Sequence, residues 1–351
     1  MNRQTLIIPK QIVTINAEME ILRNHGVQIE NGIINGICDI ANFDYDNYPG
    51  NIYVFNNLTM LPGFIQTHVH LCQSMFRGLA DDMHLLDWLQ KRIFPYENSH
   101  NRNSLRLSAQ LGINELLESG TTTILDMGTM NYQELVFEEM ISSGIRGLSG
   151  KCMLDENDLF PSFKETTEQS LSTTTELANS FHGAEDGRIK YGFAPRFALS
   201  CSEKLLKETV ELMKDYDGSL YHTHSSENLG EIAAIKRKYG KENIEFFDSI
   251  NALSDRTVLA HCIHTNEKEI ELLKVTETRV AHCPSSNLKL GSGIADIPNY
   301  LDKGISVSLG ADGAPCNNNL SMFTEMRLAA LIQKTKHGPT AMHAETMVKM
   351  A

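Results

Sequence analysis

The chain carries two histidines two residues apart, directly after an apolar run, in the stretch QTHVHLCQ. In a β-strand, residues i and i+2 point to the same face, so His68 and His70 are expected to project side by side. Such a pair is half of a typical site for a divalent metal ion, although two histidines alone are more often ordinary structural residues. The metal hypothesis therefore depends on whether other ligands converge on them.

Short apolar segments rich in β-branched residues alternate with stretches of helical periodicity from Pro62 onward. This alternation is typical of βα units and predicts a parallel sheet, and eight such units close into a (β/α)8 TIM barrel over residues 61–351. In this fold the reactive groups lie at the carboxyl ends of the strands. The predicted strands are 64–70, 121–127, 145–152, 189–195, 220–224, 258–262, 280–283 and 305–310.

Histidine or aspartate stands at the end of five of these eight strands. Histidines with unrelated structural roles would not all fall at strand ends, so the shared position of these residues favours a metal site. Imidazoles with one carboxylate suit a borderline divalent ion, zinc or Fe(II), and leave a position open for a catalytic water. Besides the first pair, the strand ends carry His222, His224, His261, His282 and Asp312.

Two histidines compete for the ligand position on the fifth strand. His222 and His224 lie two residues apart, so both can face the barrel interior. We favour His224, because it places Glu227 three residues later, above the ion, where a carboxylate can exchange protons with a bound water. His222 is then a structural group behind the ligands. His264 and His282 remain candidates for outer contacts, and His282 also for substrate binding.

The predicted chemistry is hydrolysis of a C–N or C–halogen bond at an amidine-like carbon. A bound divalent ion lowers the pKa of its water and makes hydroxide available near neutral pH. Asp312 ligates the ion and takes or orients the water's proton, Glu227 carries that proton to a ring nitrogen, and His261, unless a ligand, hydrogen-bonds the tetrahedral centre. No phosphate-binding glycine loop or nucleophile elbow in the sequence competes with this chemistry.

Residues 1–60 are expected to form the N-terminal part of a small β domain. Short β-type runs at 5–8, 26–29 and 51–55 are separated by Asn-Gly and Pro-Gly turn signals. The last stretch, residues 340–351, reads as an amphipathic helix that stops without a cap. We therefore expect the barrel to be truncated there and the C-terminal part of the small domain to be missing.

Composition limits the partners. The net charge of −13, from 31 basic and 44 acidic residues, argues against nucleic acid or an anionic membrane surface. Seven scattered cysteines without a Cys-x-x-Cys pair are typical of reduced thiols, and no apolar run is long enough for a signal peptide or a membrane helix. We expect a cytoplasmic homo-oligomer that acts on a small molecule.

The motifs PGFIQTHVH, HTHSSEN, AHCIH, AHCPSSNLKLGSGIA and SLGADGAPCNNN, in this order, resemble the amidohydrolase superfamily in its aminopurine-deaminating branch. The resemblance extends from about residue 5 and implies a metal-dependent aminohydrolase on a (β/α)8 barrel, with a β-sandwich built from both chain ends. It implies proton transfer by Glu227 and a role in the reaction for His261. Because no lysine ends the fourth strand, it implies one metal ion, held by His68, His70, His224 and Asp312.

Two groups of deaminases match different parts of the chain. GADGAPCNNN with EMRLAALIQK is similar to methylthioadenosine and S-adenosylhomocysteine deaminases, whose ribose-binding glutamate falls on Glu97. PRFALSCSE resembles guanine deaminase, in which the residues that fall on Gln73, Arg196 and Phe197 hold and stack the base. The longest match favours deamination of a 5′-modified adenosine, such as 5′-deoxyadenosine. The alternatives are guanine and a triazine or chlorinated heteroaromatic compound.

Overall fold

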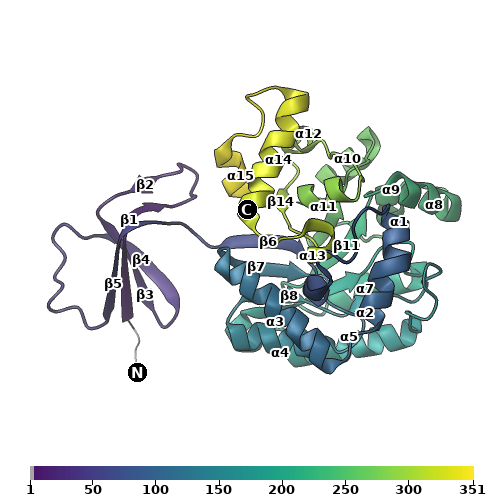
Figure 1. The fold of residues 1–351 in the computed structure, drawn as a ribbon, viewed down its shortest axis with the longest axis horizontal. Coiled ribbons are helices and arrows are strands. Elements are labelled where there is room, and N and C mark those ends of the chain that lie inside the picture. Colours follow the sequence, from purple (N-terminus) through teal and green to yellow (C-terminus); the bar gives the residue numbers. More distant parts are fainter. Residues whose placement is uncertain (1–3) are drawn as a thin grey trace. The chain divides into compact units, whose positions relative to one another are not determined.

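The computed structural model describes residues 4–351 and divides into two compact units, with the boundary in the chain after Gly63 (Figure 1). The sequence suggested a division beside this point, after residue 60. The first unit is small and built of strands, and the second, Phe64–Ala351, contains all the helices of the described chain. Among these helices, none combines the length and the apolar composition needed to cross a bilayer.

The first unit is a five-stranded sheet around β1 (Gln4–Val13). β5 (Asn51–Met60) pairs with β1 in parallel, whereas β2 (Ile21–Leu22) and β3 (His25–Glu30) pair with it antiparallel, and β4 (Ile33–Asp39) pairs with β3. The predicted β-type runs lie in β1, β3 and β5. A second layer of the expected sandwich is not among the described elements of this unit. Apolar side chains of β4 and β5 are exposed, namely Ile33, Ile34, Ile37, Tyr53, Val54, Phe55 and Leu58.

The second unit is a nearly closed parallel barrel, so the predicted (β/α)8 fold is confirmed. Its strands follow one another in chain order, with the short β9 paired to β10. The two ends of the ladder meet where the Asp312 N–H donates to the His68 carbonyl at 3.0 Å. The strands are β6 (Phe64–Val69), β7 (Thr121–Asp126), β8 (Arg146–Ser149), β9 (Cys152–Met153), β10 (Ile189–Pro195), β11 (Leu220–Ser225), β12 (Thr257–His261), β13 (Arg279–His282) and β14 (Val307–Leu309).

The third predicted strand, residues 145–152, is broken into β8 and β9. At the break the barrel backbones approach closely, because a Cβ atom on Gly150 would lie 1.8 Å from the carbonyl oxygen of Gly192. Only a residue without a side chain fits such an approach. The break therefore follows from the glycines that let neighbouring strands pack together here.

Helices cover the outside of the barrel (Figure 1). Polar caps start several of them; the Ser202 hydroxyl, for example, accepts the Leu205 N–H at the start of α7 at 3.0 Å. The longer helices are α3 (Arg102–Glu118), α4 (Gln133–Ser143), α5 (Thr167–Phe181), α7 (Glu203–Met213), α8 (Leu229–Tyr239), α10 (Glu267–Val275) and α14 (Met322–His337). The shorter ones are η1 (Leu71–Phe76), α1 (Leu85–Trp88), η2 (Leu89–Ile93), α2 (Phe94–Asn98), α6 (Ala184–Gly187), α9 (Asn243–Ser249), α11 (Pro284–Lys289), α12 (Ile297–Asp302), α13 (Ala314–Asn317) and α15 (Ala344–Met350).

Candidate active site

Four side chains meet at the carboxyl ends of the strands, and we call them the rim cluster: His68, His70, His224 and Asp312. One ligand atom from each lies within 4.8 Å of the others. Asp312 Oδ1 is 3.3 Å from His68 Nε2 and 3.2 Å from His70 Nε2, and the Nε2 atoms of His70 and His224 are 3.3 Å apart. The structure thus brings together the four residues that the sequence predicted as metal ligands.

The backbone at the strand ends fixes this geometry. His68 lies in β6 and His70 directly follows its last residue, so the alternation of side chains directs both toward the cluster. Asp312 follows β14 with a left-handed φ of 64°, and His261, at the end of β12, has a φ of 74°. Such strained conformations of non-glycine residues cluster at functional sites. The strained backbone conformations of Asp312 and His261 therefore lie at the rim, where the side chains converge.

Hydrogen bonds from behind set the direction of the imidazoles. His224 Nδ1 donates to the Arg196 carbonyl at 2.7 Å, which leaves the lone pair of Nε2 directed into the cluster. His68 Nδ1 lies 2.8 Å from His222 Nε2. The other ring nitrogen of His68, Nε2, has no hydrogen bond within the described residues. Asp312 is held by the hydroxyl of Ser286, which donates to Oδ2 at 2.7 Å.

The protonation states suit a cation. Burial lowers the pKa of His68 to about 4 and holds the pKa of His224 well below its usual value, so both imidazoles are neutral. Burial alone would raise the pKa of Asp312, but His68 and His70 hold it well below its usual range. Neutral imidazoles with converging lone pairs and one carboxylate are the donor set of a divalent metal ion. The rim cluster fits such an ion.

Glu227 and His261 lie beside the cluster. His261 Nε2 is 3.6 Å from Glu227 Oε2 and 3.9 Å from Asp312 Oδ2. Burial raises the pKa of Glu227 to about 7. Burial alone would lower the pKa of His261, but the charges of Glu227 and Asp312 raise it. A carboxyl group that titrates near neutrality next to a candidate metal site is suited to proton transfer.

Two residues that the sequence reasoning missed orient this pair. Glu231 Oε2 accepts the N–H of Glu227 at 2.9 Å, and Asn287 Oδ1 lies 2.8 Å from His261 Nδ1. The asparagine oxygen can only accept, so Nδ1 carries the proton and Nε2 faces Glu227. The capping-box spacing of Asn228 and Glu231 is a sequence signal that places the Glu231 carboxylate at the start of α8, next to the Glu227 N–H.

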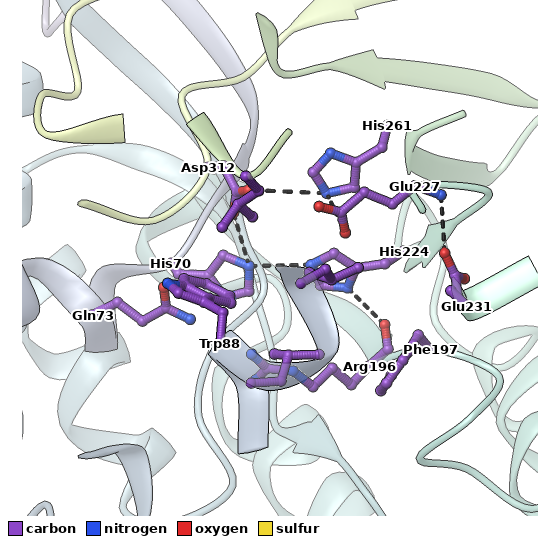
Figure 2. A pocket seen from close by; sticks show the side chains of 13 residues that line it. His70, Gln73, Trp88, Arg196, Phe197, His224, Glu227, Glu231, His261 and Asp312 are labelled. Atoms are coloured by element: carbon purple, nitrogen blue, oxygen red, sulfur yellow. Dashed lines mark hydrogen bonds and ion pairs between the residues drawn. The ribbon is translucent and has the colours of Figure 1, made fainter. Parts of the chain in front are cut away.

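A pocket opens onto these groups, and Figure 2 shows its side chains converging around the imidazoles of His70 and His224. Some residues that line the pocket were predicted from the sequence as site residues, and others were not. The apolar part of the wall, which periodicity could not distinguish from ordinary core, includes Leu85, Trp88, Leu89 and Leu290. The other lining residues are His70, Gln73, Arg196, Phe197, His224, Glu227, Glu231, His261 and Asp312.

Two predicted substrate-binding residues are not among the lining residues. Glu97 is buried in α2, where Arg196 and Gln73 donate to its carboxylate. His282 is buried at the end of β13, neither of its ring nitrogens has a hydrogen bond within the described residues, and burial lowers its pKa to about 3. Their roles in substrate binding stay predictions.

The family assignment rests on the whole barrel. Residues 59–351 match the model of the amidohydrolase family. The chain belongs to this family. The predicted membership is confirmed, and the metal dependence of the amidohydrolase family agrees with the ligand set of the rim cluster.

Curated relatives of this amidohydrolase are deaminases. The 5′-deoxyadenosine deaminase of Methanothermobacter thermautotrophicus is 36% identical over 331 residues, which are 94% of this chain and 75% of the relative. The 5-methylthioadenosine/S-adenosylhomocysteine deaminase of Thermococcus onnurineus is 38% identical over 291 residues, which are 83% of this chain and 67% of the relative. The predicted reaction class, hydrolytic deamination, is therefore confirmed.

Solved structures of deaminases share the fold. An adenosine deaminase from Xanthomonas campestris with bound zinc aligns with a TM-score of 0.91 and 26% identity, over 99% of this chain and 78% of that one. Guanine deaminase from C. acetobutylicum with bound guanine aligns with a TM-score of 0.90 and 26% identity, over 99% of this chain and 85% of that one. Both kinds of enzyme considered from the sequence are thus similar to this chain.

Proposed function

We propose that this amidohydrolase deaminates a 5′-modified adenosine, namely 5′-deoxyadenosine, methylthioadenosine or S-adenosylhomocysteine, to the inosine analogue and ammonia. The observation that carries the proposal is the placement of Glu227 and His261 beside the rim cluster, at the wall of one pocket. The choice of substrate is supported by the two curated relatives, which are named for these three nucleosides.

The rim cluster would hold one divalent ion, zinc or, as the alternative, Fe(II). A similar structure contains zinc, and imidazole with carboxylate suits either metal. When bound, the ion would lower the pKa of a water molecule and supply a nucleophile near neutral pH. His68, His70, His224 and Asp312 would hold the ion, and His222 and Ser286 fix two of these ligands from behind.

The protein moves the proton. In its ionised form, Glu227 accepts a proton from the attacking water and delivers it to a ring nitrogen of the purine. His261 hydrogen-bonds the oxygen that develops on the attacked carbon, with Asn287 holding its Nδ1 proton in place. Water adds to the carbon that bears the amino group; the remaining O–H proton of the adduct then passes to that amino group, the C–N bond breaks, and ammonia leaves as the carbonyl forms. Phe197 lines the same pocket as a stacking surface for the base.

Guanine deaminase is the second candidate, since Gln73, Arg196 and Phe197 all line the pocket and a guanine-bound structure is similar. Arg196 would donate to the exocyclic oxygen that guanine has and adenine lacks. We further expect a cytoplasmic homo-oligomer that binds neither nucleic acid nor membrane, in keeping with the net charge of −13. Light scattering on the purified protein measures the oligomeric state.

The decisive experiment is ammonia release from a panel of substrates with zinc-loaded or Fe(II)-loaded protein. The panel contains 5′-deoxyadenosine, methylthioadenosine, S-adenosylhomocysteine, adenosine and guanine. We expect turnover of at least one 5′-modified nucleoside, loss of activity on chelation and recovery on adding metal. Turnover of guanine alone would replace the proposal by the second candidate. Absence of any turnover by protein that carries its metal would refute both.

A further inference from the structure

A second group of buried polar side chains lies next to the rim cluster, and we call it the Glu97 cluster: Gln73, Glu97 and Arg196. Glu97 is 2% exposed. Its Oε1 accepts Gln73 Nε2 at 2.7 Å, and Arg196 Nη1 donates to Oε1 at 3.2 Å and to Oε2 at 2.9 Å. Both carboxylate oxygens are therefore engaged by the protein, and Glu97 does not line the pocket.

Arg196 is held in one orientation, and part of its guanidinium stays available. Nη1 makes the bonds to Glu97, and the guanidinium carbon lies 5.0 Å from the ring centroid of Phe94, in the same helix as Glu97. Within residues 4–351, Nε and Nη2 of Arg196 have no acceptor at hydrogen-bond distance. Arg196 lines the pocket, so these N–H groups can donate to a ligand (Figure 2).

Gln73 offers the complementary group. Glu97 takes its Nε2 donor, which fixes the orientation of the amide, and its Oε1 is buried without a donor among the described residues. A buried acceptor that makes no hydrogen bond is costly. Gln73 also lines the pocket, so a hydroxyl or N–H group of a ligand can satisfy this oxygen.

We propose that Glu97 is a positioning residue that orients Gln73 and Arg196, and that these two, rather than Glu97, contact a pair of vicinal hydroxyls on the substrate. One hydroxyl donates to Gln73 Oε1, and the other accepts an N–H of Arg196. The identity of the hydroxyl pair as that of a ribose rests on the proposed function. The geometry of Glu97 supports this role, because its charge is already neutralised by Arg196 inside the protein.

The test is a double-mutant cycle with Glu97→Gln, Arg196→Met and the combined variant. Kinetics use the nucleoside that the wild type deaminates. Affinity for its inosine product, and for the 2′,3′-dideoxy form of that product, follows from the fluorescence of Trp88, the single tryptophan of the chain, which lines the pocket. Melting temperatures of all four proteins report whether the buried pair is coupled.

We expect Glu97→Gln to raise KM and the product Kd by about tenfold or more, with kcat changed less than about threefold. In the Arg196→Met background the same change should raise KM and Kd by a clearly smaller factor, because only the part of its effect that passes through Gln73 remains. Binding of the dideoxy product should be insensitive to Glu97→Gln, which general damage to the fold would not produce. Either single variant should lower the melting temperature more than the neutral double variant does.

An equal penalty for Glu97→Gln in both backgrounds, or additive losses of melting temperature, would overturn the proposal. So would an unchanged Kd in Glu97→Gln with Arg196 present. The matched control is Glu134→Gln, which removes an exposed partner of Arg102 and should leave every readout within about twofold. If only guanine were turned over, the proposed substrate would fail, whereas the melting-temperature cycle would still decide the coupling of Glu97 to Arg196.

Discussion

The rim cluster and the Glu97 cluster are neighbours joined by the segment from His70 to Gln73, yet they solve the burial of polar groups in opposite ways. In the rim cluster, imidazole lone pairs and a carboxylate face one another, and His68 Nε2 has no hydrogen-bond partner within the described residues. In the Glu97 cluster, a buried arginine neutralises the carboxylate internally. The comparison teaches that the protein itself neutralises Glu97, whereas the rim cluster presents the donor set of a cation site.

The largest effect is expected at Asp312. Asp312→Asn keeps the shape of the side chain and removes the charge beside the imidazoles of His68 and His70, so metal binding should be lost and kcat/KM should fall by about a thousandfold or more. Metal content by elemental analysis and steady-state kinetics measure both. Asp87→Asn, which removes an exposed partner of Lys91, serves as the control. A variant that retained its metal and its activity would show that Asp312 is no ligand.

Glu227 is expected to come next. Glu227→Gln should lower kcat by about a hundredfold or more, because the amide cannot accept a proton. In the wild type, kcat/KM should rise with pH through about 7, as the carboxyl group ionises, and this limb should vanish in the variant. A retained limb would assign the titration to another group. Glu203→Gln, at an exposed ion pair, is the control.

The same pKa gives a stability prediction with a defined sign. The folded pKa of Glu227, about 7, lies above its usual value of 4.5, so its stabilising contribution is complete below about pH 4.5 and is lost as the pH rises through 7. In metal-free protein at pH 8, Glu227→Gln should therefore raise the free energy of unfolding, by up to about 3 kcal/mol. Denaturant titration at pH 4.5 and pH 8 checks this, and an equal effect at both values would contradict it.

A smaller effect is expected from a methyl group placed beside Gln73. A Cβ atom on Gly313 would lie 2.0 Å from Gln73 Oε1, while the backbone of Gly313, at φ −82° and ψ 149°, accepts alanine without strain. Gly313→Ala should therefore displace the Gln73 amide and raise KM by about tenfold without loss of metal. Gly36→Ala, where nothing lies within 4 Å of the added atom, is the control. An unchanged KM would mean that Gln73 reads no part of the substrate.

The smallest effect sharpens the contrast between the clusters. Glu97→Gln should leave the metal content unchanged, because Arg196 and Gln73, and no cation from outside, satisfy the carboxylate. Elemental analysis beside Asp312→Asn makes the comparison. Loss of metal in Glu97→Gln would show that the two clusters act as one site.

The barrel and the rim cluster were predictable because each depends on a repeating pattern. Alternation through β6 and the residue that follows it directs His68 and His70 to one side, and the strand ends bring His224 and Asp312 to the same rim. The length of the predicted third strand was wrong, because the close backbone approach of Gly150 to Gly192 depends on packing between strands.

The Glu97 cluster was not predictable in the same way. Glu97 and Arg196 are separated by 99 residues and lie in a short helix and after a strand, so no periodicity relates them. The resemblance to known deaminases suggested a substrate contact for each residue separately. Their mutual contact is a property of the folded chain, and it changes what Glu97 is free to bind.

The contact between β6 and the residue that follows β14 determines when the rim cluster can form. The Asp312 N–H donates to the His68 carbonyl, and this hydrogen bond joins the first and last strands of the barrel. Beside it, Thr67 and Ser308 are in contact although 241 residues separate them in the sequence. During synthesis, His68 and His70 therefore leave the ribosome long before Asp312 does. The cluster is complete only once β14 lies beside β6, so binding of a metal ion by these four residues would report that the barrel strands have come together.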